Sequence, residues 1–235
     1  MNIAELVNGG KTDINITLTA DIDLTGKGWT PIGTDYDNSY TGTFDGGGHT
    51  ITGLTFTTND EYAGLFGWLN RAGTVKNVVM EGVQITSNQI YGGSIGGVVG
   101  SGWGTIENCS VSGSVSGTVY VGGVVGAQIG GSITGCSSSA TVKGTVDVGG
   151  VAGQTNSSAT MTACYATGNV IIEINPKKNI AGGGLVGMNA GSSLLACYAT
   201  GNVTSTGSST GYVHIGGFLG DNYITVLSLI HISEP

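Results

Sequence analysis

Four cysteines are the residues with the most obvious chemistry, and they follow one another at intervals of 27, 28 and 33 residues. Thiolates can hold zinc, but zinc sites draw on closely spaced ligand pairs such as C-x2-C. One cysteine in every 27 to 33 residues provides no such pair. We therefore expect no metal site and no cofactor. The cysteines are Cys109, Cys136, Cys164 and Cys197.

Two tyrosines directly follow cysteines. Tyr165 and Tyr198 lie in identical heptads, Cys-Tyr-Ala-Thr-Gly-Asn-Val. Consecutive strand residues point to opposite faces of a sheet, so inward cysteines would place both tyrosines outside. Exposed aromatic rings can stack on sugars or contact a protein. The commoner role of such a pair is to stabilise the sheet across strands. Tyr165 and Tyr198 are the candidate ligand-binding residues.

Five aspartates near the N-terminus could supply oxygen ligands to calcium. They match neither the EF-hand loop nor the calcium-binding nonapeptide repeat. Aspartate beside glycine also satisfies the backbone of turns, and we expect this structural role. The five are Asp21, Asp23, Asp35, Asp37 and Asp45.

Groups that could catalyse a reaction are few and scattered. Glycoside hydrolysis needs two carboxyl groups on one face. His49 and His214 have no serine elbow and no H-E-x-x-H motif beside them. The acids within the repeats occupy different repeat phases; they are Glu81, Glu107, Asp147 and Glu173. We therefore expect no catalytic residues and a protein that is not an enzyme.

A repeat must position all these residues. A glycine, two apolar residues and a glycine recur along the chain, and a cysteine follows four of these motifs after nine to eleven residues. In the first repeat Val78 stands where the cysteine would be. The motifs span residues 64–67, 97–100, 123–126, 150–153, 184–187 and 217–220.

Stacking follows from the size of the unit. The closing glycines lie 26 to 34 residues apart, and a unit of two or three short strands cannot bury both faces alone. Stacked units align equivalent positions about 4.8 Å apart. This predicts an all-β fold, a β-solenoid of stacked glycine-rich repeats. Val78 and the four cysteines would form an interior ladder of free thiols and small apolar groups. A disulfide between neighbouring coils is the alternative.

Composition supports this architecture and excludes several partners. Glycine supplies 45 of the 235 residues and charged residues only 9%. So much glycine disfavours a helix-rich fold. Seven lysines and arginines, against a net charge of -8, leave no basic surface for nucleic acid. The polar, glycine-rich segments are unsuited to spanning a bilayer, so we expect no membrane insertion.

The chain divides into three parts. Residues 1–61 are expected to form the first, more polar coils and the cap of the solenoid, since Ile14 to Leu24 alternate apolar and polar residues as a strand or strand pair does. Residues 62–226 contain about six repeats. The loop 173–179 is the most obvious insertion. The segment 227–235 breaks the glycine rhythm.

Several ordered motifs carry a family resemblance. The runs Ile16 to Leu24, Trp29 to Gly33, Gly42 to Ile51 and Ala63 to Gly67 precede repeats of Gly-Gly-x-Val-Gly and Asn-Cys. Together they resemble bacterial surface proteins with the GLUG motif, over residues 14–220. The resemblance implies a secreted or cell-surface β-solenoid of the kind found in adhesins and in non-catalytic regions of immunoglobulin A metallopeptidases.

What the resemblance implies for function is adhesion to a host glycan, a matrix protein or a polysaccharide. The resemblance also implies an extracellular or cell-surface location. The start of the chain lacks the basic and apolar segments typical of a signal peptide, so we expect the sequence to be a fragment of a longer protein. The alternatives are the non-catalytic stalk of a large secreted metallopeptidase, part of a polysaccharide-degrading β-helix protein, or a spacer.

The last nine residues, Leu227 to Pro235, resemble the conceptual translation of a transposon-end adapter used in DNA library preparation. We expect this segment to be non-native and to carry no function. A genuine last strand is the alternative.

Overall fold

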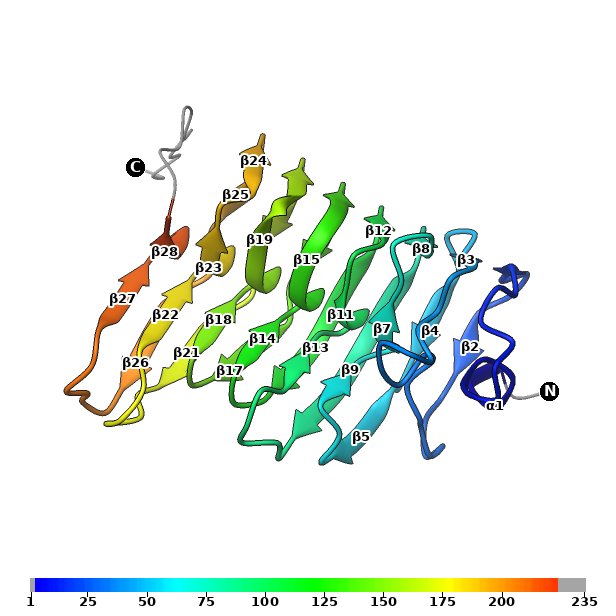
Figure 1. Cartoon of the computed structure of the whole chain (residues 1–235), viewed down its shortest axis with the longest axis horizontal. Coiled ribbons are helices and arrows are strands. Elements are labelled where there is room, and N and C mark those ends of the chain that lie inside the picture. Colours follow the sequence, from blue (N-terminus) through cyan, green and yellow to red (C-terminus); the bar gives the residue numbers. More distant parts are fainter. Residues whose placement is uncertain (1–2, 224–235) are drawn as a thin grey trace.

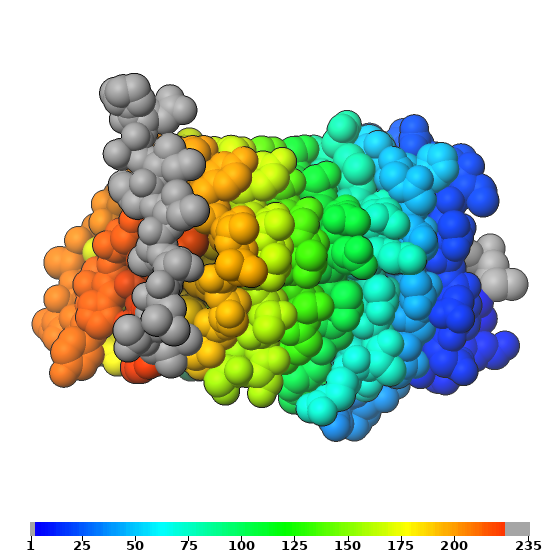
Figure 2. Space-filling model, turned by 90° about the horizontal axis from the view of Figure 1, so that it is seen from above, coloured from blue at the N-terminus to red at the C-terminus, as the bar shows by residue number. Residues whose placement is uncertain are grey.

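The computed structural model describes residues 3–223, which wind into a parallel β-solenoid (Figure 1). Strands from successive turns of the chain pair side by side, so each turn, or coil, lies on the one before it. The predicted fold class is confirmed. Figure 2 shows the coils as successive colour bands along the long axis of the molecule.

The strands form three sheets, named here A, B and C. Sheet A contains β1 (Ile16–Thr17), β3 (Thr43–Asp45), β7 (Phe66–Leu69), β8 (Thr74–Lys76), β11 (Val99–Gly102), β12 (Thr105–Glu107), β15 (Val125–Thr134), β19 (Ala152–Thr162), β23 (Val186–Ala190), β24 (Ser193–Leu195) and β28 (Leu219–Asn222). Sheet B contains β2 (Ile22–Asp23), β4 (Thr50–Thr52), β5 (Thr55–Thr58), β9 (Val79–Ser87), β13 (Ser110–Ser116), β16 (Ser137–Ser138), β17 (Thr141–Gly144), β20 (Tyr165–Ala166), β21 (Val170–Glu173), β25 (Tyr198–Ala199) and β26 (Val203–Thr206). Sheet C contains β6 (Tyr62–Ala63), β10 (Ser94–Ile95), β14 (Tyr120–Gly122), β18 (Asp147–Gly149), β22 (Ile180–Gly183) and β27 (Val213–Gly216).

Sheet C reproduces the sequence repeat. Its six strands come one from each repeat, and each ends at or just before a glycine motif. The pairing keeps equivalent residues in line: Ile95 aligns with Val121, and Val121 aligns with Val148. All three side chains are fully buried. Burial of one such side chain contributes about 1.5–3 kcal/mol, so aligned apolar columns fix the register of the stack.

From the second motif onward, the closing glycine sets the distance between sheets C and A. A Cβ atom on Gly126 would lie 2.3 Å from the backbone nitrogen of Ile95, and one on Gly153 would lie 2.5 Å from that of Val121. Each of these glycines therefore packs against the sheet C backbone of the preceding coil. A side chain at this position would force the two sheets apart, which explains why glycine is repeated there.

The alternating segment for which the sequence predicts a strand or a strand pair forms two strands in the structure. Residues 14–24 form two short strands, β1 and β2, which belong to different sheets and pair with the next coil. The alternation continues across the corner between them, where Leu18 is buried. The short helix α1 (Ile3–Asn8) lies at the N-terminal end of the stack, with Ala4 and Val7 buried (Figure 1). The sequence predicts capping coils here, and the helix is an addition to them.

Two further segments were singled out in the sequence. The insertion 173–179 connects β21 to β22, and most of it is exposed. The segment 227–235 lies outside the described residues. Within residues 3–223, no helix has the length and apolar character needed to cross a membrane.

Candidate functional site

A corner between sheets A and B positions both the cysteines and the tyrosines. The residue just before each interior ladder position has a positive φ: 53° at Asn77, 50° at Asn108 and 52° at Ala196. Gly135 and Ala163 occupy the same place, with φ of 62° and 53°. This left-handed residue turns the chain out of sheet A and directs the next side chain inward.

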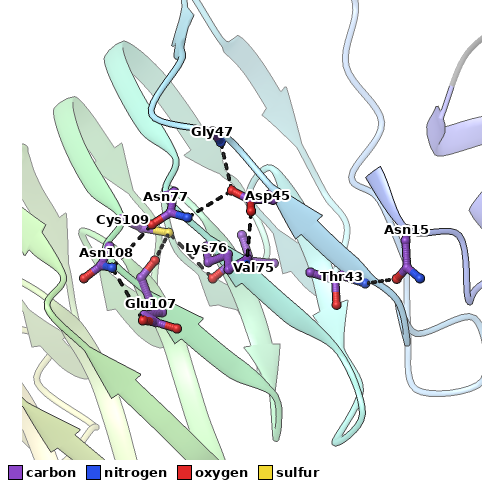
Figure 3. A network of polar contacts seen from close by, with 10 residues as sticks. All are labelled: Asn15, Thr43, Asp45, Gly47, Val75, Lys76, Asn77, Glu107, Asn108 and Cys109. Atoms are coloured by element: carbon purple, nitrogen blue, oxygen red, sulfur yellow. Dashed lines mark hydrogen bonds and ion pairs between the residues drawn. The ribbon is translucent and has the colours of Figure 1, made fainter. Parts of the chain in front are cut away.

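Amide side chains support the first of these corners (Figure 3). The Nδ2 group of Asn77 donates to Oδ1 of Asp45 at 3.0 Å, and Nδ2 of Asn108 donates to Oδ1 of Asn77 at 3.3 Å. This row of amide hydrogen bonds ends at Gly135, which has no side chain to continue it. Asparagine tolerates the left-handed region and also links the coils here.

The cysteines occupy the interior position that follows. Cys109, Cys136 and Cys164 are buried beside the equally buried Val78, and Cys197 is half-buried. All four are free thiols. The thiol of Cys136 contacts the backbone oxygen of Thr134 at 3.4 Å and accepts a long hydrogen bond from the N–H of Cys109 at 3.5 Å.

Burial and mutual contact also suppress the reactivity of this column. A hydrogen bond with the Cys109 thiol, together with desolvation, raises the pKa of Cys136. The pKa of Cys164 rises to about 12, chiefly through its hydrogen bond with Cys136. Only the thiolate is a good nucleophile or metal ligand, so these groups are held in the form suited to packing.

The two candidate tyrosines stand on the outer face of sheet B. Tyr165 and Tyr198 are direct partners in the pairing of β20 with β25, and their side chains are 37% and 42% exposed. Their ring centroids are 5.0 Å apart and their planes differ by 2°. Parallel rings at this separation must overlap face to face. One face of Tyr165 is therefore covered by Tyr198, and its other face is turned toward Ser137, its partner in the preceding coil.

A depression lies beside this free ring face. Ser110 and Ser137 continue the tyrosine column toward the N-terminus, and their small side chains leave a hollow of about 220 Å³. Tyr165 and Thr167 line one end of it and Glu81 the other. These serines interrupt the aromatic column, and the interruption forms a concave surface with hydroxyl groups.

Two of the N-terminal aspartates accept hydrogen bonds from backbone N–H groups. Asp21 accepts the backbone N–H of Thr50 at 2.9 Å, and Asp45 accepts that of Gly47 at 2.9 Å. The bond from Thr50 lowers the pKa of Asp21. At Asp45 the amide of Asn77 has the largest effect, followed by the bond from Gly47, and both lower the pKa. Within residues 3–223 no group of three or more potential ligands is placed to hold a metal ion.

A second feature, absent from the sequence analysis, lies between sheets A and C. The closing glycines bring two outer columns face to face: one in sheet C, through Tyr120 and Asp147, and one in sheet A, through Ala127 and Gln154. We call the space between them the A–C groove. Its positions lie three residues before a motif's opening glycine, or two in the first motif, and one residue after the closing glycine. The residues at these two flanking positions were the signal by which the groove could have been found in the sequence.

Aromatic side chains fill the N-terminal end of the A–C groove. The ring of Trp68 packs edge-on against Tyr62 with centroids 4.5 Å apart, against Trp103 at 5.7 Å and against Tyr36 at 6.1 Å. Trp68 is buried and its indole N–H has no hydrogen-bond partner within the described structure. Tyr36 comes from a loop that covers the cluster and remains 59% exposed.

Acidic groups meet at the other end. Asp147 lines a cavity of about 290 Å³ together with His214 and Asp221. Nδ1 of His214 lies 3.1 Å from Oδ2 of Asp221. Burial, with a smaller contribution from Asp221, raises the pKa of Asp147 to about 7. Asp147 differs in repeat phase from the other acids considered in the sequence, and His214 has no catalytic motif beside it. The pairing of coils nevertheless brings both residues to Asp221, which the sequence did not single out.

The fold and its surfaces define a class: a parallel β-solenoid built from glycine-bounded repeats. Residues 91–116 and 117–143 match the family model described as the GLUG motif, which confirms the resemblance identified in the sequence.

Similar proteins include halomucin of Haloquadratum walsbyi, 38% identical over 120 residues, and a protein named "Putative Gly-rich membrane protein" from Evansella cellulosilytica, 39% identical over 100 residues. These matches cover 47% and 41% of the chain but only 1% and 11% of the relatives. A crystal structure described as a putative immunoglobulin A1 protease from Bacteroides ovatus has the same fold, with a TM-score of 0.67 and 24% identity. That likeness covers 90% of this chain and 78% of the other.

Proposed function

We propose that this solenoid is a non-enzymatic adhesive module outside the cell, and that it binds a polysaccharide or host glycan beside Tyr165 and Tyr198. The observation that carries the proposal is the free face of the Tyr165 ring beside the serine-lined depression. The similarity to halomucin and to a protein named as a membrane protein supports a surface location.

The geometry suits a sugar ring. An aromatic face offers a flat apolar surface for the C–H face of a pyranose, and hydroxyl groups beside it can bond to sugar hydroxyls. Tyr198 supports Tyr165 from behind, so the ring is held upright without the ligand. The hydroxyls of Ser110 and Ser137 line the depression in front of it. Preorganised groups of this kind reduce the entropy lost on binding.

Removal of the ring is the first test. Tyr165→Ala should weaken binding of the best ligand from a glycan and matrix-protein array by about tenfold or more, equivalent to about 1.4 kcal/mol. Tyr91→Ala is the matched control, because Tyr91 is 76% exposed and belongs to neither surface. Equal loss in both variants, or none in either, would contradict the proposal.

Ser137→Tyr separates binding from sheet stabilisation. The new ring would extend the stack and fill the depression. If the tyrosines serve only the sheet, this variant should be at least as stable as the parent and bind equally well. The proposal expects an equally stable protein that has lost binding. A well-folded parent chain that binds no glycan or matrix protein would favour the spacer or stalk of a larger secreted protein.

A further inference from the structure

We propose that the A–C groove holds a second ligand site, in which Asp147 and Asp221 bind the ammonium group of an amino sugar within a polysaccharide. This site shares no lining residue with the depression beside Tyr165. It is therefore argued independently of the proposed adhesive surface.

Asp147 is the first observation. It lies on the outward side of β18, yet the groove walls leave only 6% of it exposed. Its backbone N–H is fixed by the oxygen of Val119 at 2.8 Å. Its carboxyl group accepts no hydrogen bond from any residue in 3–223, although it lines the cavity. The residue is almost wholly buried, and its carboxyl oxygens keep only the contact that the cavity offers, so they are free to accept hydrogen bonds from a ligand there.

The surroundings favour a cation. No lysine or arginine is among the described residues that line the cavity, and its ionisable groups besides tyrosines are Asp147, Asp221 and His214. Tyr120, on the neighbouring coil, adds an aromatic ring next to Asp147. Carboxylates together with aromatic rings attract an ammonium group electrostatically. The raised pKa of Asp147 supports this view, because a bound cation would stabilise its ionised form.

The remaining lining favours a sugar as the carrier of that cation. Gln154 and Asn179 place amide groups at the cavity, and Tyr212 and Tyr223 add hydroxyl groups and rings. Amide and hydroxyl groups can each bond to sugar hydroxyls. The cavity, about 290 Å³, has room for a ring rather than for an ammonium group alone. It also lies in line with the groove, so a chain of sugars could continue along the groove beyond the cavity.

A pair of hexamers tests the charge directly. The full chain is titrated at pH 7 with a glucosamine hexamer and with its N-acetylated counterpart, in which neutral acetamide groups replace the ammonium groups. We expect the glucosamine hexamer to bind at least about tenfold more tightly, equivalent to about 1.4 kcal/mol. Equal affinities, or no binding of either hexamer, would overturn the proposal.

Two variants locate the preference. Asp147→Asn keeps the shape of the side chain and should abolish the preference for glucosamine, as should Asp221→Asn. Asp13→Asn, which removes the same charge from an exposed residue of the first coil, should leave it unchanged. A preference that survives in Asp147→Asn, while thermal melting shows all variants folded, would exclude this site.

Two further measurements distinguish an amino sugar from a protein ligand, and the A–C groove from the surface beside Tyr165. A lysine-rich peptide whose binding depends on Asp147, with no binding of the glucosamine hexamer, would indicate a protein partner and overturn the proposal. Tyr165→Ala should leave the glucosamine preference intact. Loss of that preference in Tyr165→Ala would place the amino sugar at the tyrosine surface instead.

Discussion

The cysteine column and the tyrosine column lie one residue apart on the same coils, yet they differ in kind. The inner column holds a valine and four cysteines, all small. The outer column runs from Val79 through Ser110 and Ser137 to Tyr165 and Tyr198. Inside, backbone atoms of neighbouring coils limit the volume at every repeat. Outside, only the backbone is constrained, so side chains there can vary in size and chemistry.

This difference shows which part of a repeat can carry function. A repeated interior position is explained by packing alone, and its thiols need no chemical role. Variation at the next position creates local shapes, such as the hollow before Tyr165. If packing fixes the inner positions and leaves the outer ones free, substitutions at the two kinds of position should differ in their effect on stability.

Asp147 occupies an outer position, yet its carboxyl group is desolvated like that of a buried residue. Its pKa in the folded protein is about 7, above the ordinary value of 3.8, so the folded state binds more protons than the unfolded state between these values. Stability should therefore fall as pH rises from about 4 to 7, and the loss should be complete above that range. Asp147→Asn removes this loss, and its advantage over the parent should grow by up to about 4 kcal/mol between pH 3 and 8. Urea unfolding across this range measures it. Identical pH profiles for parent and variant would show that the groove does not desolvate Asp147.

Gly126 lies where sheets C and A approach so closely that no side chain fits. Gly126→Ala should destabilise the protein by about 3 kcal/mol, because the new Cβ would lie 2.3 Å from the nitrogen of Ile95. Gly217→Ala is the control, since a Cβ there would meet no atom within 4 Å. Chemical denaturation should show a large loss for the first and little change for the second. Similar effects for both would refute the role given to the closing glycine.

Neighbouring residues allow the same substitution on both sides of the sheet. Cys136→Leu overpacks the interior and should cost about 2 kcal/mol. Ser137→Leu, one residue later on the outer face, should change stability by about 0.5 kcal/mol or less. Unfolding midpoints of the two variants provide the comparison. A larger loss at residue 137 than at 136 would reverse the assignment of the two faces.

Substitutions at the corner between the cysteine column and the tyrosine column should have the smallest effect on stability, and that effect should be stabilising. Ala163 and Ala196 have positive φ, which costs an ordinary residue roughly 1–2 kcal/mol. Ala196→Gly should raise stability by about 0.5–1 kcal/mol, since glycine adopts this conformation without steric cost. Thermal melting can detect the shift, with Ala199→Gly as the comparison in a regular strand. Destabilisation by Ala196→Gly would contradict the conformation described here.

Sequence periodicity predicted the solenoid because the constraints that produce it are local and repeated. The motif at 123–126 marks a tight approach, and the cysteine about ten residues later occupies an equivalent place in each coil. The A–C groove could not be predicted in this way. It depends on two segments that only a closing glycine brings together, and Asp147 meets Asp221 across more than one coil. The left-handed alanines were missed because alanine gives no sign of that conformation.

The central claim, that the interior supports the coils while the outer tyrosine column binds, can be tested by residue-resolved NMR titration. The full chain, with its thiols intact, would be titrated with the glycan selected by the array. The account predicts shifts concentrated at Ser137, Tyr165 and Thr167, with Cys136 and Cys164 following only as neighbours. Shifts centred on another face of the solenoid, with Tyr165 unaffected, would contradict it.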